Sequence, residues 1–322
     1  MSVSSAPASV PVTPNAPTSL SASPSSPPRP TNSPALTGDL TAVVERWTLA
    51  RPLSREAVVV DGGELLIAGG LTSQGTTGQV VQIDPASGTQ DVVGALARPA
   101  HDAAAATLAN VHFVFGGGAS ATSAAAQTFG IGAASKVVGQ LPVPRSDLDS
   151  AVVGSVAYVL GGYDGSAVEP QVLATSDGRH FDDVGSLPVP VRYPAVAALG
   201  NDIYVFGGEH NGTPTDAVQR FDTRTRSSEV VGHLRAPLAH ATGIVISGTI
   251  YLLGGVAGVA GGADTAPVAA ISRFDPSSEA TVAAGRLPYA VSDAGAAVIG
   301  DTAYLLGGEG PQRLATVIAI HP

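Results

Sequence analysis

Short apolar runs recur along the chain, and each of them ends in a pair of glycines. The six runs with their glycine pairs are Leu66-Ile67-Ala68-Gly69-Gly70, Phe113-Val114-Phe115-Gly116-Gly117, Tyr158-Val159-Leu160-Gly161-Gly162, Tyr204-Val205-Phe206-Gly207-Gly208, Tyr251-Leu252-Leu253-Gly254-Gly255 and Tyr304-Leu305-Leu306-Gly307-Gly308. The first glycines of successive pairs lie 47, 45, 46, 47 and 53 residues apart. Short aliphatic and aromatic runs between turn-forming residues are typical of β-strands. The pattern predicts an all-β chain of six repeats.

Each repeat contains four predicted strands, as the fourth repeat illustrates with segments 195–199, 203–206, 216–221 and 227–231. The breaks carry turn residues, among them Asp61-Gly62-Gly63, Ser247-Gly248 and Gly300-Asp301, which supply the positive φ that tight hairpins need. Four short strands in about 45 to 50 residues are the signature of a propeller blade. We therefore expect a six-bladed β-propeller of four-stranded antiparallel blades over residues 39–322.

The ends of the chain indicate how this ring closes. A strand-like segment, residues 41–47, precedes the first glycine pair, whereas only a third strand, residues 315–320, follows the last pair. The N-terminal strand should therefore complete the last blade. Such pairing removes an exposed strand edge, which would otherwise invite aggregation.

The glycine pairs, their period and the ends of the third strands, Ile83-Asp84, Phe221-Asp222 and Phe274-Asp275, resemble the kelch repeat. The resemblance covers about residues 40 to 322 and implies a propeller similar to the central domain of galactose oxidase. Kelch propellers serve as partner-binding modules and, in a few families, as enzymes. The copper centre of the galactose oxidase type needs a Cys-linked tyrosine, and this chain has no cysteine. No cofactor is expected.

Residues 1–38 differ in composition from the repeats, with nine Pro, ten Ser and Arg29 as their one charge. Such a segment buries too little apolar surface to fold, so we expect a disordered Pro/Ser-rich linker or stalk. A spacer of this kind favours an extracytoplasmic propeller, secreted or anchored to the cell envelope by a segment upstream. The charge-free span 241–263 contains seven Gly and fits the repeat, so membrane insertion of the propeller is not expected.

The charge balance bears on the partner. Sixteen Lys and Arg against 26 Asp and Glu give a formal charge of −10, which disfavours nucleic acid. No spacing of His, Asp and Glu places three or four metal ligands together, so no metal site is expected.

Strand alternation predicts which loops share a face. Blade-to-blade crossings and second-to-third-strand loops lie on one side, and the crossings end at the innermost strand, so their side chains should surround the mouth of a central channel. The candidate binding residues on the crossings are Arg55, His101, Asp102, Arg145, Asp147, Arg192, Tyr193, His240 and Asp293. Those on the second-to-third-strand loops are Tyr163, Asp164, Glu209, His210 and Glu309. A ring that mixes Arg with Asp and His can hydrogen-bond a carboxylate or a polyol.

Three functions remain open at this point. The favoured one is a non-enzymatic binding or interaction module that presents the mixed-charge face to a protein or carbohydrate ligand. The alternative is a sugar epimerase or mutarotase acting on a sialic acid or a hexose, with Glu209 as base, His240 as acid and Arg192 as anchor. A structural scaffold is the third. An open face without displaced pKa values favours binding, whereas a deep funnel with a displaced pKa favours catalysis.

Overall fold

The computed structural model of the 322-residue chain describes residues 1–2, 39–258 and 265–322. The predicted stalk, residues 1–38, lies outside the described residues except for Met1 and Ser2. Backbone contacts divide the chain into two units, Met1–Ser33 and Pro34–Pro322. The second unit holds all the strands described below.

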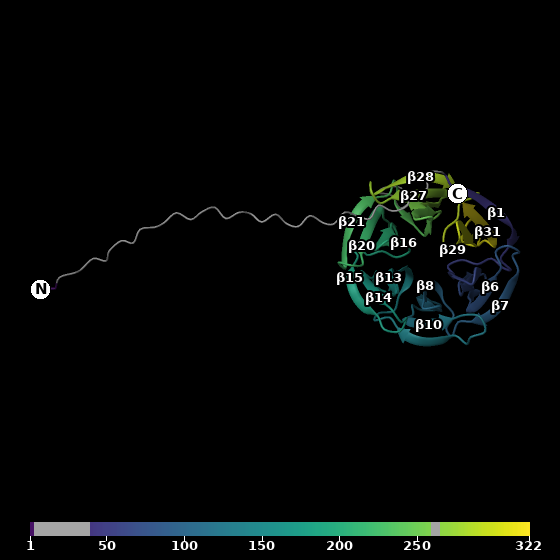
Figure 1. The fold of residues 1–322 in the computed structure, drawn as a ribbon, viewed down its shortest axis with the longest axis horizontal. Coiled ribbons are helices and arrows are strands. Elements are labelled where there is room, and N and C mark those ends of the chain that lie inside the picture. Colours follow the sequence, from purple (N-terminus) through teal and green to yellow (C-terminus); the bar gives the residue numbers. More distant parts are fainter. Residues whose placement is uncertain (3–38, 259–264) are drawn as a thin grey trace. The chain divides into compact units, whose positions relative to one another are not determined.

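Six four-stranded antiparallel sheets form the second unit, and Figure 1 shows them arranged in a ring. We number these blades along the chain. Blade 1 is β2 (Ala57–Asp61), β3 (Glu64–Ala68), β6 (Gln79–Ile83) and β7 (Gln90–Ala95); blade 2 is β8 (His101–Leu108), β9 (Val111–Gly118), β10 (Ala125–Phe129) and β11 (Lys136–Gln140); blade 3 is β12 (Ser146–Val153), β13 (Val156–Tyr163), β14 (Gln171–Thr175) and β15 (Asp182–Ser186).

The second half of the ring repeats this arrangement. Blade 4 is β16 (Ala195–Leu199), β17 (Asp202–Phe206), β20 (Ala217–Asp222) and β21 (Ser227–His233); blade 5 is β23 (Thr242–Ile246), β24 (Thr249–Leu253), β27 (Ala270–Asp275) and β28 (Ala280–Arg286); blade 6 is β29 (Gly295–Ile299), β30 (Thr302–Leu306), β31 (Thr316–His321) and β1 (Thr41–Thr48). Short strands lie in the crossings and loops: β4 (Leu71–Thr72), β5 (Gly75–Thr76), β18 (Glu209–His210), β19 (Thr213–Pro214), β22 (Leu238–Ala239), β25 (Val256–Gly258) and β26 (Thr265–Pro267).

The N-terminal strand closes the ring. β1 pairs antiparallel with β31, so that Thr41 lies opposite His321 and Val44 opposite Ile318. The innermost strands contact one another in the order β2, β8, β12, β16, β23, β29 and again β2. All six blades therefore join in a closed circle, and the first and last strands of the circle share one sheet.

The core lies between neighbouring blades. Phe115 of blade 2 and Leu173 of blade 3 belong to one buried cluster, and Phe206 of blade 4 and Phe274 of blade 5 belong to another. Each blade is therefore held on both faces by apolar side chains of its neighbours. The channel wall is formed by the innermost strands.

The glycine pairs hold each crossing against the blade that it leaves, as Gly207 and Gly208 show. The amide of Gly208 donates to the carbonyl of Leu238 over 2.8 Å, and a Cβ on Gly207 would lie 2.0 Å from that oxygen. Gly207 also has a φ of 57°, which L side chains rarely adopt. The second glycine of every pair donates to a crossing carbonyl in this way: those of Leu53, Ala100, Arg145, Val191, Leu238 and Val291.

Candidate binding site at the channel mouth

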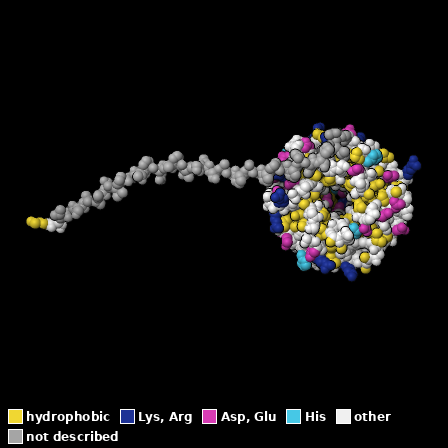
Figure 2. Space-filling model, in the orientation of Figure 1, with side chains coloured by type: hydrophobic (Ala, Val, Ile, Leu, Met, Phe, Trp, Pro, Cys, Tyr) yellow, Lys and Arg dark blue, Asp and Glu magenta, His cyan; other side chains and the backbone are white. Residues whose placement is uncertain are grey.

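Each crossing delivers one residue to the channel mouth, and that residue comes six positions after the buried leucine that starts the crossing. All six adopt positive φ, which is uncommon for residues other than glycine, so the repeated geometry follows from the blade architecture. These mouth residues are Arg55 (60°), Asp102 (52°), Asp147 (62°), Tyr193 (52°), His240 (57°) and Asp293 (54°). They line one hollow of about 110 Å³, and Figure 2 shows the ring hollowed at its centre.

Backbone hydrogen bonds connect successive mouth residues around the channel. The amide of His240 donates to the carbonyl of Tyr193 over 3.0 Å, and the amide of Asp293 donates to the carbonyl of His240 over 3.0 Å. The same bond joins Arg55 to Asp293, Asp102 to Arg55 and Tyr193 to Asp147. These five bonds fix where the six side chains begin.

Arg55 is the centre of one group of charges at the mouth. Its guanidinium lies 3.2 Å from Asp102, 3.1 Å from Glu309 and 3.7 Å from Asp293. Its Nη1 also donates to the hydroxyl of Tyr193 over 3.3 Å. Four acceptors therefore surround this arginine, and its pKa lies above its ordinary range because the neighbouring carboxylates outweigh the effect of burial.

Glu209 and His240 form the second group. Arg192 reaches Glu209 at 2.9 Å and Asp147 at 3.5 Å. The two nitrogens of His240 lie 2.7 Å from Asp293 and 3.3 Å from Glu209. Burial alone would lower the pKa of His240, but its bonds to these two carboxylates outweigh burial and raise the pKa to about 9. His240 is therefore a cation at neutral pH.

Tyr193 joins the two groups. Its ring stacks on His240 with centroids 4.0 Å apart, and the guanidinium carbons of Arg192 and Arg55 lie 5.1 and 5.5 Å from its ring centroid. Contacts between cations and the face of an aromatic ring are attractive. Three cations thus converge on one tyrosine, which holds the network as a single unit.

Carboxylates outnumber cations in this network by five to four. Five carboxylates, those of Asp102, Asp147, Glu209, Asp293 and Glu309, face the cations Arg55, Arg192 and His240, and Arg313 lies 3.7 Å from Glu309. Every arginine at the mouth already has carboxylate partners. The mouth therefore offers more to a ligand that donates hydrogen bonds or carries positive charge than to an anion.

The comparisons with known proteins agree with this architecture. The Kelch motif model matches residues 190–234. Kelch-like protein 25 of Xenopus tropicalis is 24% identical over 152 residues, covering 46% of this chain and 25% of that protein. Kelch-like protein 35 of Mus musculus is 28% identical over 177 residues, covering 54% and 29%. The solved structure of YjhT matches with a TM-score of 0.72 over 85% of this chain and 99% of that chain, at 14% identity.

The chain is a kelch-repeat β-propeller. It covers between a quarter and three tenths of the length of the two Kelch-like proteins. The likeness to YjhT concerns the fold alone, because the identity is 14%. Among the described residues, no helix has the length and apolar character to cross a membrane.

Most of the predicted site residues come together in this kelch propeller, but Arg145 does not. Its side chain is 1% exposed and donates to the carbonyl of Gln171 over 2.8 Å, with Glu169 3.8 Å away. Arg145 lies four positions after its leucine, at the buried step of the crossing, rather than at the mouth. Its predicted place in the channel ring is wrong: it bridges blades 2 and 3.

Four other predicted residues lie beside the network. His101 lies 3.6 Å from Asp102 and bonds Thr76. Tyr163 and His210 border a separate hollow of about 530 Å³ that Arg192 also lines. Asp164 accepts from the amides of Ser166 and Ala167, which lowers its pKa and gives it a turn-stabilising role.

Two acids deeper in the channel were not among the predicted residues. Glu56 and Asp149 line a cavity of about 260 Å³ together with small residues of the inner strands. Oε1 of Glu56 accepts from the amide of Gly295 over 3.2 Å, while Oε2 is buried and has no hydrogen-bond partner among the described residues. Burial raises the pKa of Glu56 to about 8 and that of Asp149 to about 7.

Repeat alignment could have identified both acids. Glu56 follows a mouth residue directly, at the position where the other blades have Ala103, Leu148, Pro194, Ala241 and Ala294. A charged residue is unusual at a repeat position that is apolar in the other five blades. Within the described residues, His, Asp and Glu form no group of three suited to a metal ion.

Proposed function

We propose that this kelch propeller is a non-enzymatic interaction module that binds a partner protein at the channel mouth, with a basic side chain of the partner entering the hollow. The observation that carries the proposal is the excess of carboxylates over cations in a rigid network. A lysine or arginine of the partner would donate hydrogen bonds to these carboxylates. A polyol such as a carbohydrate is the second ligand class that the same acceptors support.

The rigidity of the mouth supports binding. Five backbone hydrogen bonds join the mouth residues, and their side chains hold one another through ion pairs and through Tyr193. Binding to such a preorganised surface costs little ordering entropy. Kelch propellers generally act as partner-binding modules, which agrees with this proposal.

The mutarotase alternative has one observation in its favour, which is the displaced pKa values in the hollow. Burial raises the pKa of Asp102 to about 7, against the attraction of Arg55. The pKa values of the proposed acid, His240, and the proposed base, Glu209, are nevertheless unsuited to proton transfer. Bonds from His240 and Arg192 lower the pKa of Glu209, while the pKa of His240 rises to about 9. Efficient proton transfer needs both values near the working pH, so the pair favours binding over catalysis.

Affinity capture tests the proposal. Immobilised full-length protein should retain a partner, and Glu209→Gln with Asp147→Asn should lose it, because two of the five carboxylates no longer carry charge. The matched control is Arg224→Ala with Arg226→Ala in the turn between β20 and β21, on the opposite face, which should leave retention unchanged. Retention by the double carboxylate variant would contradict the proposal.

Anomer interconversion followed by proton NMR tests the alternative. We expect no acceleration with N-acetylneuraminate or simple hexoses. Acceleration that disappears in Glu209→Gln or Arg192→Ala would establish the enzyme instead.

We also propose an extracytoplasmic location, with residues 1–38 as a linker. The support is compositional: nine Pro and ten Ser precede the propeller. Fractionation of cells of the source organism, with antibody detection, should find the protein outside the cytoplasm. Recovery in the cytoplasmic fraction alone would contradict the proposal.

A further inference from the structure

Six equivalent grooves lie between neighbouring blades, each bounded by a crossing and by the third and fourth strands of the next blade. In five of them a side-chain hydrogen bond joins the crossing to the third strand of the next blade or to the residues just before it, whereas in the sixth Arg235 of the crossing reaches Thr281 of the fourth strand. The five bridges are Arg51 to Thr77, Gln127 to the backbone of Arg98, Arg145 to the carbonyl of Gln171, Gln219 to the backbone of Val189, and Tyr289 to Thr316.

The groove between blades 4 and 5 is built differently. The cross-strand pair that faces it is Ser272 and Ala283, the smallest of the six equivalent pairs. The other five pairs are Val81/Val92, Gln127/Val137, Leu173/Asp183, Gln219/Val230 and Ile318/Val44. A pocket of about 440 Å³ lies here, larger than the pocket of about 170 Å³ in the corresponding groove between blades 6 and 1.

The backbone at this groove also lacks the side-chain partner that blades 2 and 4 provide. In blades 2 and 4 a buried glutamine accepts from and donates to the backbone of the residue two positions after the leucine, at distances of 2.8–2.9 Å. Ala236 is the corresponding residue here. Ser272 stands at the glutamine position and has no amide to offer to Ala236.

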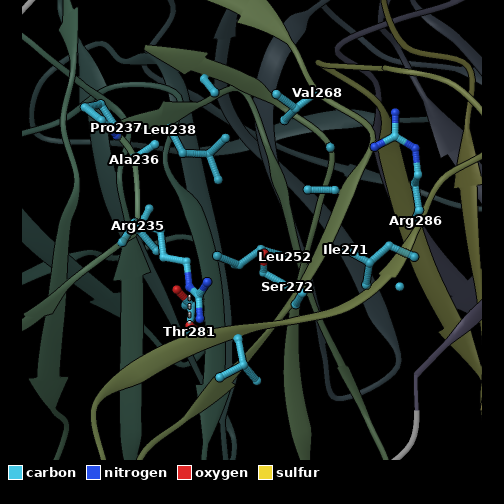
Figure 3. A pocket seen from close by; sticks show the side chains of 17 residues that line it. Arg235, Ala236, Pro237, Leu238, Leu252, Val268, Ile271, Ser272, Thr281 and Arg286 are labelled. Atoms are coloured by element: carbon cyan, nitrogen blue, oxygen red, sulfur yellow. Dashed lines mark hydrogen bonds between the residues drawn. The ribbon is translucent and has the colours of Figure 1, made fainter. Parts of the chain in front are cut away.

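The pocket combines apolar walls with two cations. Leu238, Leu252 and Ile271 contribute to the walls. Figure 3 shows Arg235 and Arg286 on opposite sides, with Arg235 directed at Thr281. Its volume lies within the range of pockets that hold small organic ligands.

Both arginines are available to an anion. Nε of Arg235 lies 3.4 Å from the carbonyl of Thr281, a long hydrogen bond, and neither Arg235 nor Arg286 forms an ion pair with any described residue. Arg145 in the corresponding groove, by contrast, is enclosed by carbonyls and Glu169. Both Arg235 and Arg286 are exposed, so an anion in the groove can reach them.

We propose that the groove between blades 4 and 5 binds a small amphipathic carboxylate. Its apolar body would occupy the space beside Ser272 and Ala283, which the larger pair Val81 and Val92 narrows in the corresponding groove between blades 6 and 1. Its carboxylate would bind the guanidinium of Arg235 or Arg286, since arginine matches carboxylate geometry. This site is separate from the channel mouth, whose network favours cationic and hydroxyl-bearing groups.

Isothermal titration of the full-length protein with hydrocinnamate, compared with its neutral amide, tests the proposal. The wild type should bind hydrocinnamate saturably and about tenfold more tightly than hydrocinnamide, because hydrogen bonds to a charged group are stronger. Arg235→Gln with Arg286→Gln should bring the two affinities to within about twofold, since the apolar walls remain. Arg224→Gln on the opposite face is the matched control and should change neither affinity.

Ser272→Gln tests the location directly, because it restores the side chain found at the same position of blades 2 and 4. Binding of hydrocinnamate should fall at least about tenfold, while the melting temperature should not fall. Ala283→Val narrows the same groove by a second route if the glutamine variant does not fold. The proposal is overturned if the wild type shows no saturable binding, if it does not distinguish acid from amide, or if the groove-filling variants bind as the wild type does.

Discussion

The buried acid Glu56 should make the propeller less stable as pH rises, and Glu56→Gln should remove that dependence. Its side chain is 7% exposed, and burial raises its pKa from the ordinary value of 4.5 to about 8. The folded state therefore binds the proton more tightly than the unfolded state does. The stabilisation is complete below pH 4.5 and is lost as pH rises through about 8.

The size of the effect follows from the two pKa values. One pKa unit corresponds to about 1.4 kcal/mol of differential stabilisation. Between pH 5 and pH 9, ionisation of Glu56 should cost about 4 kcal/mol of unfolding free energy. Glutamine keeps the shape and an oxygen that accepts from Gly295, but it cannot ionise. The unfolding free energy of Glu56→Gln, relative to that of the wild type, should therefore rise by about 1.4 kcal/mol per pH unit and level off above pH 8.

Urea unfolding of both proteins at each pH from 5 to 9 measures this difference in stability. The urea midpoints are converted to unfolding free energies with the same slope for both proteins. Asp91→Asn, an exposed acid of β7, is the matched control and should show a difference that does not depend on pH. If the difference between Glu56→Gln and the wild type were flat across this range, Glu56 would not be a buried neutral acid. The description of the channel interior would then be wrong.

Three further changes test the architecture of the propeller. Gly207→Ala should lower the unfolding free energy, measured in urea, by roughly 3 kcal/mol or more, because its Cβ would lie 2.0 Å from the carbonyl oxygen of Leu238. Gly200→Ala is the control: Gly200 has a positive φ but nothing within 4 Å of a Cβ, so this change should cost only about 1 kcal/mol. Arg145→Met should lower stability by about 3 kcal/mol by leaving buried carbonyls unpaired, and an unchanged melting temperature would contradict the bridging role. Deleting residues 1–48 removes β1 and exposes β31, so the protein should aggregate, as light scattering would reveal.

The strand pattern of the propeller could be predicted because the residues that define it repeat. In every blade the glycine pair contacts a carbonyl of the crossing. The pairs therefore recur in the sequence at a nearly fixed period. The predicted N-terminal strand, residues 41–47, differs from β1 by one residue. The strand ends in the structure differ from the predicted ends by up to two residues, because strand pairing continues past the apolar positions. β21, for example, extends to His233 where residue 231 was expected.

The site was harder to predict, and the reason is register. Mouth residues lie six positions after the leucine and buried residues lie four positions after it, so the polar residues of the crossings include both kinds. Arg145 falls on the buried step and resembles a mouth residue only by its charge. Asp149 lies on an inner strand, where the other blades have Ala57, Ala104, Ala195, Thr242 and Gly295, and it interrupts an otherwise uncharged column. The contacts of His240 with Glu209 and Asp293 bring together residues 31 and 53 positions apart, which no local pattern reveals.

Hydrogen exchange of the full-length protein, free and saturated with its captured partner, tests the proposed binding face most directly. The account predicts protection in the segments that carry Arg55, Asp102, Asp147, Tyr193, His240 and Asp293, and in the loop at Glu209. The turns between third and fourth strands, such as residues 222–227, should exchange as they do in the free protein. Protection confined to those turns, with the six mouth segments unchanged, would contradict the claim that the channel mouth is the binding surface.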